Sequence, residues 1–136
     1  MVMSQEKADT LDIKPLARIT AYAAAFRDPQ YLFYAPVDAV KMITDKLGVT
    51  IDHFDLIEAN EAFAAQCLAD TKEIGWDLER VNVHGGGVAL GHPIGASGAR
   101  VVTTLLYALK DRGKRTGLAT LCLGGGGAVA MSFELL

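Results

Sequence analysis

Three side chains that can do acid–base or hydrogen-bond chemistry stand at or just after predicted strand ends: Asn60, His92 and Cys122. Asn60 follows one short apolar segment, His92 lies in the turn after the next, and Cys122 lies at the end of a third. In a sheet of parallel strands flanked by helices, ligands bind beyond the carboxyl ends of the strands. We therefore expect these side chains to meet at one edge of the sheet.

Each of these residues has a chemical task that suits its surroundings. His92 precedes a proline at the amino end of a predicted long helix, where a neutral imidazole can take a proton from a thiol or donate to a carbonyl oxygen. Cys122 is followed by the glycine run 124–127, whose exposed N–H groups can form an oxyanion hole. Its thiolate can act as a base toward carbon acids. The amide of Asn60 can hold a water molecule or a carbonyl group.

Taken singly, each residue also has a purely structural explanation. Asn60 can be a helix N-cap, His92 a structural residue before proline, and Cys122 a small buried hydrophobic residue. Their shared position beside two glycine-rich loops favours a functional site. By contrast, Cys67 is expected in a helix core and His53 in a surface turn, while His84 is either structural or borders the site.

Several other classes of site are excluded by the same sequence. The glycine runs lack a following Gly-Lys-Ser/Thr and lack the spaced glycines and downstream acid of a dinucleotide fingerprint. The two cysteines have no ligand-like spacing to the three histidines, which argues against a metal site. A net charge of −3 without a basic stripe argues against a nucleic-acid partner.

Hydrophobic periodicity predicts an α/β fold in one domain over residues 1–136, with residues 1–13 a remnant of a preceding element. Asn60 is expected to cap the second helix, with Glu61 in its first turn. We expect a mixed five-stranded sheet, mainly parallel with one antiparallel edge, and the order strand, helix, strand, helix, strand, helix, strand, strand. The predicted strands are 16–25, 54–59, 81–83, 117–123 and 128–135, and the helices are 36–47, 60–75 and 95–112.

The composition indicates a chain with more apolar surface than one small domain needs. The hydrophobic fraction is 51% and the mean hydropathy is +0.24, yet no segment is long enough for a membrane helix. We expect the surplus surface to meet another domain, the alternative being a well-filled core. The first residues have no apolar signal core, so the expected location is cytoplasmic.

Three segments closely resemble the carboxy-terminal signature blocks of thiolases, and the resemblance extends over essentially the whole chain. It is nearest to the acetyl-CoA acetyltransferase branch and implies half of a three-layer thiolase fold, with helices on both faces of the sheet. The segments are Asn60-Glu61-Ala62-Phe63-Ala64, the run from Gly91-His92-Pro93 to Arg100, and Cys122-Leu123-Gly124-Gly125-Gly126.

This resemblance implies roles in a two-step acyl transfer, by Claisen condensation or its reverse, thiolysis. His92 would activate a cysteine nucleophile and help bind the thioester oxygen, with Asn60 holding a water molecule beside it. Cys122 would move the proton on the acetyl α-carbon, the N–H of Gly124 would complete a second oxyanion hole, and Phe63 would line the pantetheine path. The coenzyme A thioester is the substrate, and no cofactor or metal is implied.

The nucleophilic cysteine of thiolases lies in the amino-terminal half, which this sequence lacks. The chain is therefore expected to be inactive alone and to work with an amino-terminal half or subunit, and it is also expected to self-associate. A non-catalytic acyl-CoA-binding or oligomerisation module is the alternative, and a ketoacyl-synthase-like enzyme is a weaker third possibility. Two departures from the family pattern are the aromatic segment 31–36, which would alter the acyl pocket, and His84 in place of asparagine.

Overall fold

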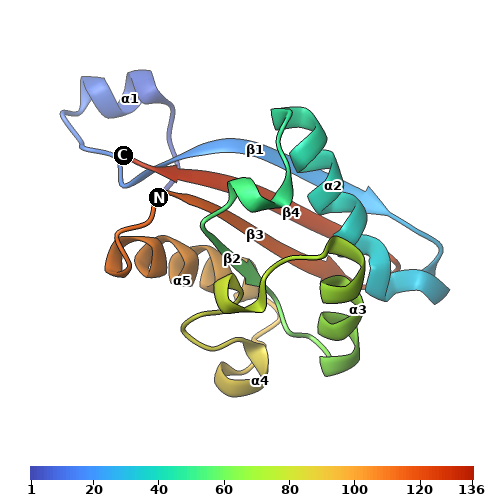
Figure 1. The fold of residues 1–136 in the computed structure, drawn as a ribbon. Coiled ribbons are helices and arrows are strands. Elements are labelled where there is room, and N and C mark those ends of the chain that lie inside the picture. Colours follow the sequence, from blue (N-terminus) through green and yellow to red (C-terminus); the bar gives the residue numbers. More distant parts are fainter.

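Four strands form a single sheet in the order β1-β4-β3-β2 in a computed structural model that describes all residues 1–136 (Figure 1). Only β2 and β3 are parallel, whereas β4 pairs antiparallel with both β1 and β3. The strands are β1 (Ala17–Phe26), β2 (Leu56–Ala59), β3 (Thr116–Leu123) and β4 (Gly127–Leu135). The α/β class is confirmed, but the prediction of a five-stranded, mainly parallel sheet is wrong.

The missing fifth strand is the segment around Val81, which makes one isolated parallel bridge with Ile57. The next residue, Asn82, has a φ of 49°, in the left-handed region that a strand cannot use. Its side chain accepts from Ala59 N at 2.9 Å and donates to Ala59 O at 2.9 Å. The Asn82 side chain thus occupies the backbone groups of Ala59 that a continuing strand would pair with, and the pairing ends after one bridge.

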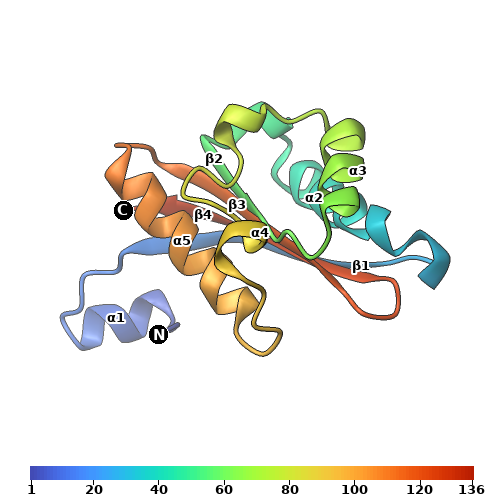
Figure 2. The same ribbon diagram turned by 90° about the horizontal axis from the view of Figure 1, so that it is seen from below.

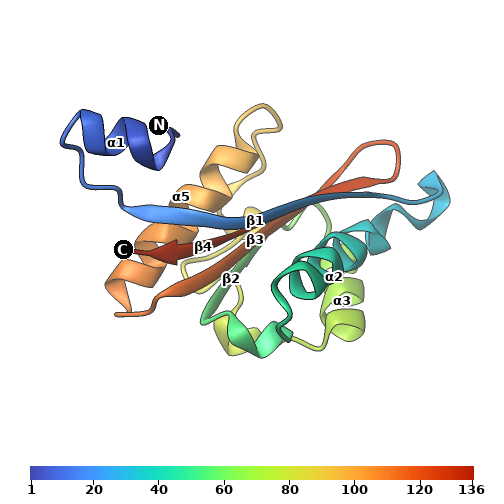
Figure 3. The same ribbon diagram turned by 90° about the horizontal axis from the view of Figure 1, so that it is seen from above.

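Helices cover both faces of the sheet, which gives the expected three layers (Figures 2 and 3). Helices α2 and α3 lie on one face and α5 lies on the other. A short helix, α1, extends from the sheet as an arm, and α4 lies in the loop before α5. The bounds are α1 (Gln5–Thr10), α2 (Ala35–Leu47), α3 (Ala64–Ile74), α4 (Gly87–Leu90) and α5 (Ser97–Asp111), with 3-10 turns at Pro29–Tyr34, Ile51–His53 and Leu78–Arg80.

Helix α2 matches its prediction because its end signals are local. Pro36 stands in its first turn, and Gly48 ends it with a φ of 67°, a conformation that costs glycine little. Its buried side chains include Val40 and Ile43 and pack on the sheet. The structure contains no helix that could span a bilayer.

Helix α3 begins four residues later than predicted, and Asn60 does not cap it. The backbone of Asn60 continues the pairing of β2 with β3, because its N–H donates to Thr120 O at 2.9 Å. The helix starts at Ala64 after the extended residue Phe63 and ends at Gly75, where the sequence predicted its end. Asn60 and Glu61 are thereby released from helix geometry and become available to the neighbouring loops.

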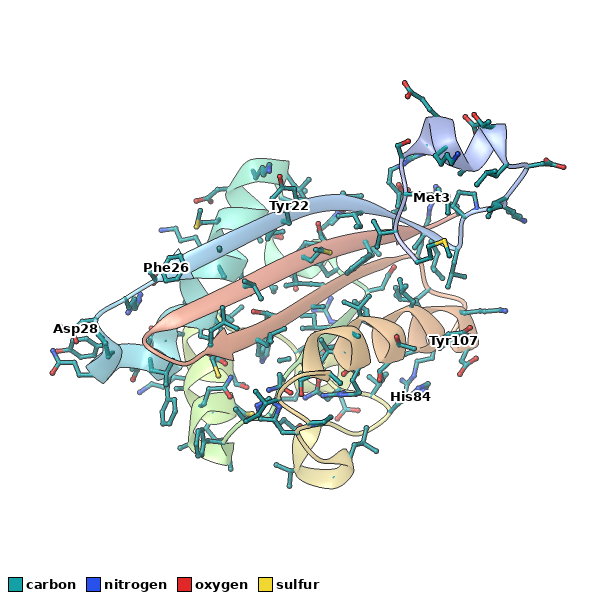
Figure 4. The ribbon with its side chains drawn as sticks, turned by 180° about the vertical axis from the view of Figure 1, so that it is seen from behind. Met3, Tyr22, Phe26, Asp28, His84 and Tyr107 are labelled. Carbon is teal, nitrogen blue, oxygen red and sulfur yellow. The ribbon has the colours of Figure 1, made fainter.

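The two faces of the sheet are covered unequally. On the α2 face, 14 buried residues form the larger core cluster, which includes Phe54 and the single tryptophan, Trp76, whose indole N–H donates to Thr71 Oγ1 at 3.0 Å. On the α5 face the buried cluster has only seven residues, because α5 covers β2 and β3 and leaves β1 open. Tyr22 and Phe26 lie on β1 (Figure 4) and are 68% and 76% exposed.

An apolar trough runs on this open face between α5 and the outer strands. Its lining includes Ala24, Gly98, Val102, Leu121, Val129 and Met131. The start of α5 is therefore flanked by apolar surface, as expected for a chain with surplus hydrophobic residues.

Candidate active site

Asn60 lies fully buried at the carboxyl end of β2, with its side chain toward α5. Its Nδ2 is 3.5 Å from His92 Nε2, and its Oδ1 is 3.4 Å from the Nη2 of Arg100. The amide therefore joins the end of a strand, the loop before α5 and the first turn of α5.

His92 lies in the exposed loop that precedes α5 and is tied to the start of that helix. Its Nδ1 is 2.6 Å from the hydroxyl of Ser97, which in turn donates to the Pro93 carbonyl at 3.1 Å. The helix begins at Ser97, two residues later than predicted. The same Pro93 carbonyl accepts the N–H groups of Ala96 and Ser97, so part of the helix start is already hydrogen-bonded.

The segment that leads to His92 is held by Glu61. Its carboxylate accepts from Asn82 Nδ2 at 2.8 Å and from Val88 N at 2.9 Å. The carboxylate lies so close to Gly86 that a Cβ on that residue would be 2.2 Å from Glu61 Cδ. Glycine at position 86 thus lets Glu61 anchor both α4 and the loop that presents His92.

Cys122 lies at the same edge of the sheet, two residues beyond Thr120, whose carbonyl pairs with Asn60. Strand alternation places its side chain with Leu118 on the α2 face, whereas Asn60 contacts α5 on the opposite face. Cys122 is half-buried and its thiol makes no side-chain hydrogen bond. The structure therefore brings Asn60 and His92 into contact, whereas Cys122, at the same edge on the adjoining strand, directs its side chain to the other face of the sheet.

Two thiols and a buried carboxyl group lie near one another where β3 meets α3. Burial raises the pKa of Cys122, and the nearby Asp70 carboxylate raises it further. Burial likewise raises the pKa of Cys67 to about 11. Asp70 is fully buried and hydrogen-bonded by Gln66, and burial raises its pKa to about 7. Both thiols are consequently protonated at neutral pH.

The remaining predicted site residues flank this edge. Gly124 is exposed in the turn between β3 and β4, and its N–H makes no backbone hydrogen bond. Phe63 is 59% exposed and packs on Phe33, with ring centroids 5.4 Å apart. Phe33 belongs to the aromatic segment 31–36, so this segment lies directly against Phe63. His84 lies in an exposed loop (Figure 4) and makes no side-chain hydrogen bond.

Sequence reasoning missed the ion pair behind this site. Glu58, 1% exposed on β2, accepts from Arg100 Nη1 at 3.1 Å, and Arg100 also reaches Asn60. Burial raises the pKa of Glu58 to about 7, which Arg100 partly offsets. A charged residue within the apolar segment Leu56–Ala59 was the available signal, since a buried charge needs a partner.

Comparison with known proteins agrees with this architecture. The family described as "Thiolase, C-terminal domain" matches residues 13–135. The chain is 52% identical to an acetyl-CoA acetyltransferase of Syntrophomonas wolfei and 54% identical to one of Pseudomonas aeruginosa, covering 100% and 97% of this chain but 35% and 34% of those proteins. The chain thus spans about a third of the length of these relatives.

Solved structures are similar over the same extent. The Bacillus anthracis acetyl-CoA acetyltransferase is 48% identical with a TM-score of 0.95, and the Acat5 thiolase from Ascaris suum, solved in complex with coenzyme A, is 44% identical with a TM-score of 0.91. Each covers 98% of this chain, which covers 34% of each. The fold is that of an α/β domain with a polar edge, and the chain belongs to the thiolase family as its carboxy-terminal domain.

Proposed function

We propose that this chain is the carboxy-terminal catalytic half of an acetyl-CoA C-acetyltransferase. The observation that carries the proposal is the contact of Asn60 with His92, beside the strand end that bears Cys122. The relatives named acetyl-CoA acetyltransferase support the substrate class, a coenzyme A thioester. The complete enzyme would join two acetyl-CoA molecules or cleave acetoacetyl-CoA with free coenzyme A.

In the first step, a cysteine of an amino-terminal half attacks the thioester carbonyl. His92 takes the proton of that cysteine, the C–S bond to coenzyme A breaks, and the acyl group stays on the enzyme. Coenzyme A leaves as the thiol after receiving the proton of the Cys122 thiol, which becomes a thiolate. Asn60, whose amide already faces His92, holds a water molecule that helps bind the thioester oxygen.

In the second step, the thiolate of Cys122 left by the first step removes a proton from the α-carbon of a second acetyl-CoA. Its raised pKa supports this role, because the conjugate base of a weak acid binds a proton strongly. The carbanion attacks the acyl-enzyme carbonyl, a C–C bond forms, and the nucleophilic cysteine leaves as a thiolate that takes its proton back from His92. The unpaired N–H of Gly124 stabilises the negative oxygen, and Phe63 lines the path of the pantetheine arm.

This mechanism needs a nucleophile that the chain itself does not supply. Cys67 is on α3 with a strongly raised pKa, and Cys122 is assigned to proton transfer. We therefore propose that the chain has no turnover alone and requires an amino-terminal half, which would also cover the open α5 face.

Complementation tests the proposal directly. The 136-residue chain is mixed with the separately produced amino-terminal half of a relative, and acetoacetyl-CoA cleavage is followed. We expect no cleavage by either part alone and measurable cleavage by the mixture. Cys122→Ser should abolish the gain, whereas Cys67→Ser, the matched control, should keep it.

Other outcomes of this experiment would change the assignment. A mixture that associates without any gain in rate would favour a non-catalytic, acyl-CoA-binding or oligomerisation module. Turnover by the 136-residue chain alone, lost in Cys122→Ser, would show that no second half is needed.

A further inference from the structure

A continuous row of polar side chains runs from the interior of the sheet to His92. It starts at Glu58, passes through Arg100 and Asn60 to His92, and ends at Ser97. Glu58, Asn60 and Ser97 are each at most 1% exposed, and the row opens to water only at the partly exposed Arg100 and at the imidazole. Glu58 Oε1 and Arg100 Nε make no hydrogen bond, but the other polar groups of the row are partnered within the protein, which restricts how each can be oriented.

The first restriction concerns the amide of Asn60. A guanidinium group only donates hydrogen bonds, so the amide atom that faces Arg100 must be the oxygen. The Nδ2 of Asn60 is then the atom that faces His92 Nε2. Glu58 keeps Arg100 in place, because its carboxylate is the one acidic partner of that guanidinium.

The second restriction concerns the proton on His92. An amide N–H₂ is a donor, so His92 Nε2 can take part in this contact only through its lone pair. In the neutral ring the proton then lies on Nδ1, which donates to Ser97 Oγ at 2.6 Å. The Ser97 hydroxyl in turn donates to the Pro93 carbonyl. From Arg100 through Asn60 and His92 to Ser97, each contact thus allows only one choice of donor and acceptor.

We propose that Glu58 and Arg100 are positioning residues that set the tautomer of His92 through the amide of Asn60. They hold Nε2 without a proton, ready to accept one, while Nδ1 carries the ring hydrogen. The catalytic meaning of this arrangement rests on the function proposed above. The tautomer itself is a property of the 136-residue chain and can be measured without any turnover.

Nitrogen NMR of the histidine rings tests the proposal on the full 136-residue chain. Because burial raises the pKa of Glu58 to about 7, the spectra are recorded at about pH 8, where that carboxyl is ionised. We expect His92 to be the Nδ1–H tautomer. Arg100→Met should remove this preference and give a mixture of both tautomers, and Arg100→Lys should partly restore it. Arg112→Met, directly after the same helix, is the matched control, since Arg112 bonds only the Val83 carbonyl.

A second variant keeps the test decisive if Arg100→Met fails to fold. Asn60→Asp replaces the donor facing Nε2 by an acceptor and should move the ring proton to Nε2. An Nε2–H tautomer in the unchanged chain, or spectra unaltered in folded Arg100→Met and in Asn60→Asp, would overturn the proposal. Failure of the complementation assay with the expected tautomer would instead count against the proposed function alone.

Discussion

The two faces of the sheet differ in how completely they are covered. The α2 face carries a core of 14 buried residues closed by α2, α3 and Trp76, whereas the α5 face buries seven and leaves β1 open. The loop that carries His92 lies at the start of α5, on the less covered side. The closed face therefore holds most of the buried core, whereas the open face exposes apolar surface.

The largest expected effect is the difference in unfolding free energy lost when two phenylalanines, one on each face, are replaced by alanine. Phe54→Ala removes a side chain that is 1% exposed in the closed core and should cost about 3–5 kcal/mol of unfolding free energy. Phe26→Ala removes one that is 76% exposed on the open face and should cost less than about 1 kcal/mol. Urea unfolding of both variants measures the contrast, and equal losses would show that the open face contributes as much as the closed one.

A second effect comes from the buried carboxyl of α3. Because the folded pKa of Asp70 is raised from 3.8 to about 7, its contribution is fully present at low pH and is lost as pH rises toward 7. Between about pH 4 and pH 8 the unchanged chain should lose on the order of 2–4 kcal/mol of unfolding free energy through Asp70, at about 1.4 kcal/mol per pKa unit. Asp70→Asn should abolish this loss. Urea unfolding at both pH values measures this. The exposed Asp9→Asn should leave the profile unchanged, and a profile equally unchanged in Asp70→Asn would contradict the assignment.

A smaller loss of unfolding free energy is expected where Glu61 anchors the loop that carries His92. Gly86→Ala places a methyl group 2.2 Å from the Glu61 carboxyl carbon, so the carboxylate must move and release Asn82 and Val88 N. The cost should be about 1–3 kcal/mol, with faster hydrogen exchange at the Val88 amide. Gly95→Ala, whose Cβ meets nothing within 4 Å, is the control. Unchanged exchange at Val88 in Gly86→Ala would show that Glu61 does not hold this loop.

The smallest expected effect has opposite signs in two measurements. The added methyl of Gly98→Ala in the first turn of α5 meets nothing within 4 Å, so the isolated chain should gain up to about 1 kcal/mol from helix propensity. The same methyl would project into the apolar trough and should weaken binding of an amino-terminal half. Thermal unfolding and a binding titration measure the two effects. Unweakened binding would indicate that the partner does not contact the start of α5.

The features that were predictable from sequence are those with local causes. Helix α2 runs from a proline to a left-handed glycine, and both signals lie within its own segment. The start of α3 was not predictable in this way, because Asn60 pairs with Thr120, sixty residues further along the chain. Local preference favoured a helix cap, and a long-range strand contact prevailed over it.

The candidate site shows the same division. The topology of strand ends correctly placed Asn60 and His92 together, but the direction of Cys122 depends on the strand pleat and register. The Val81 segment looked like a strand, yet the side chain of Asn82 takes up the backbone groups that a strand would use. Glu58 was detectable as a charge among apolar residues, although its partner Arg100 is supplied by a distant helix.

Trp76 has a practical consequence for following the chain in solution. It is the only tryptophan, it is 5% exposed, and it lies within the closed core. Its fluorescence is therefore an intrinsic reporter of one side of the molecule, which responds to denaturation and stays silent when a ligand or subunit docks beside α5. A probe for docking has to be placed on the other side, where Tyr107 is exposed on the helix (Figure 4).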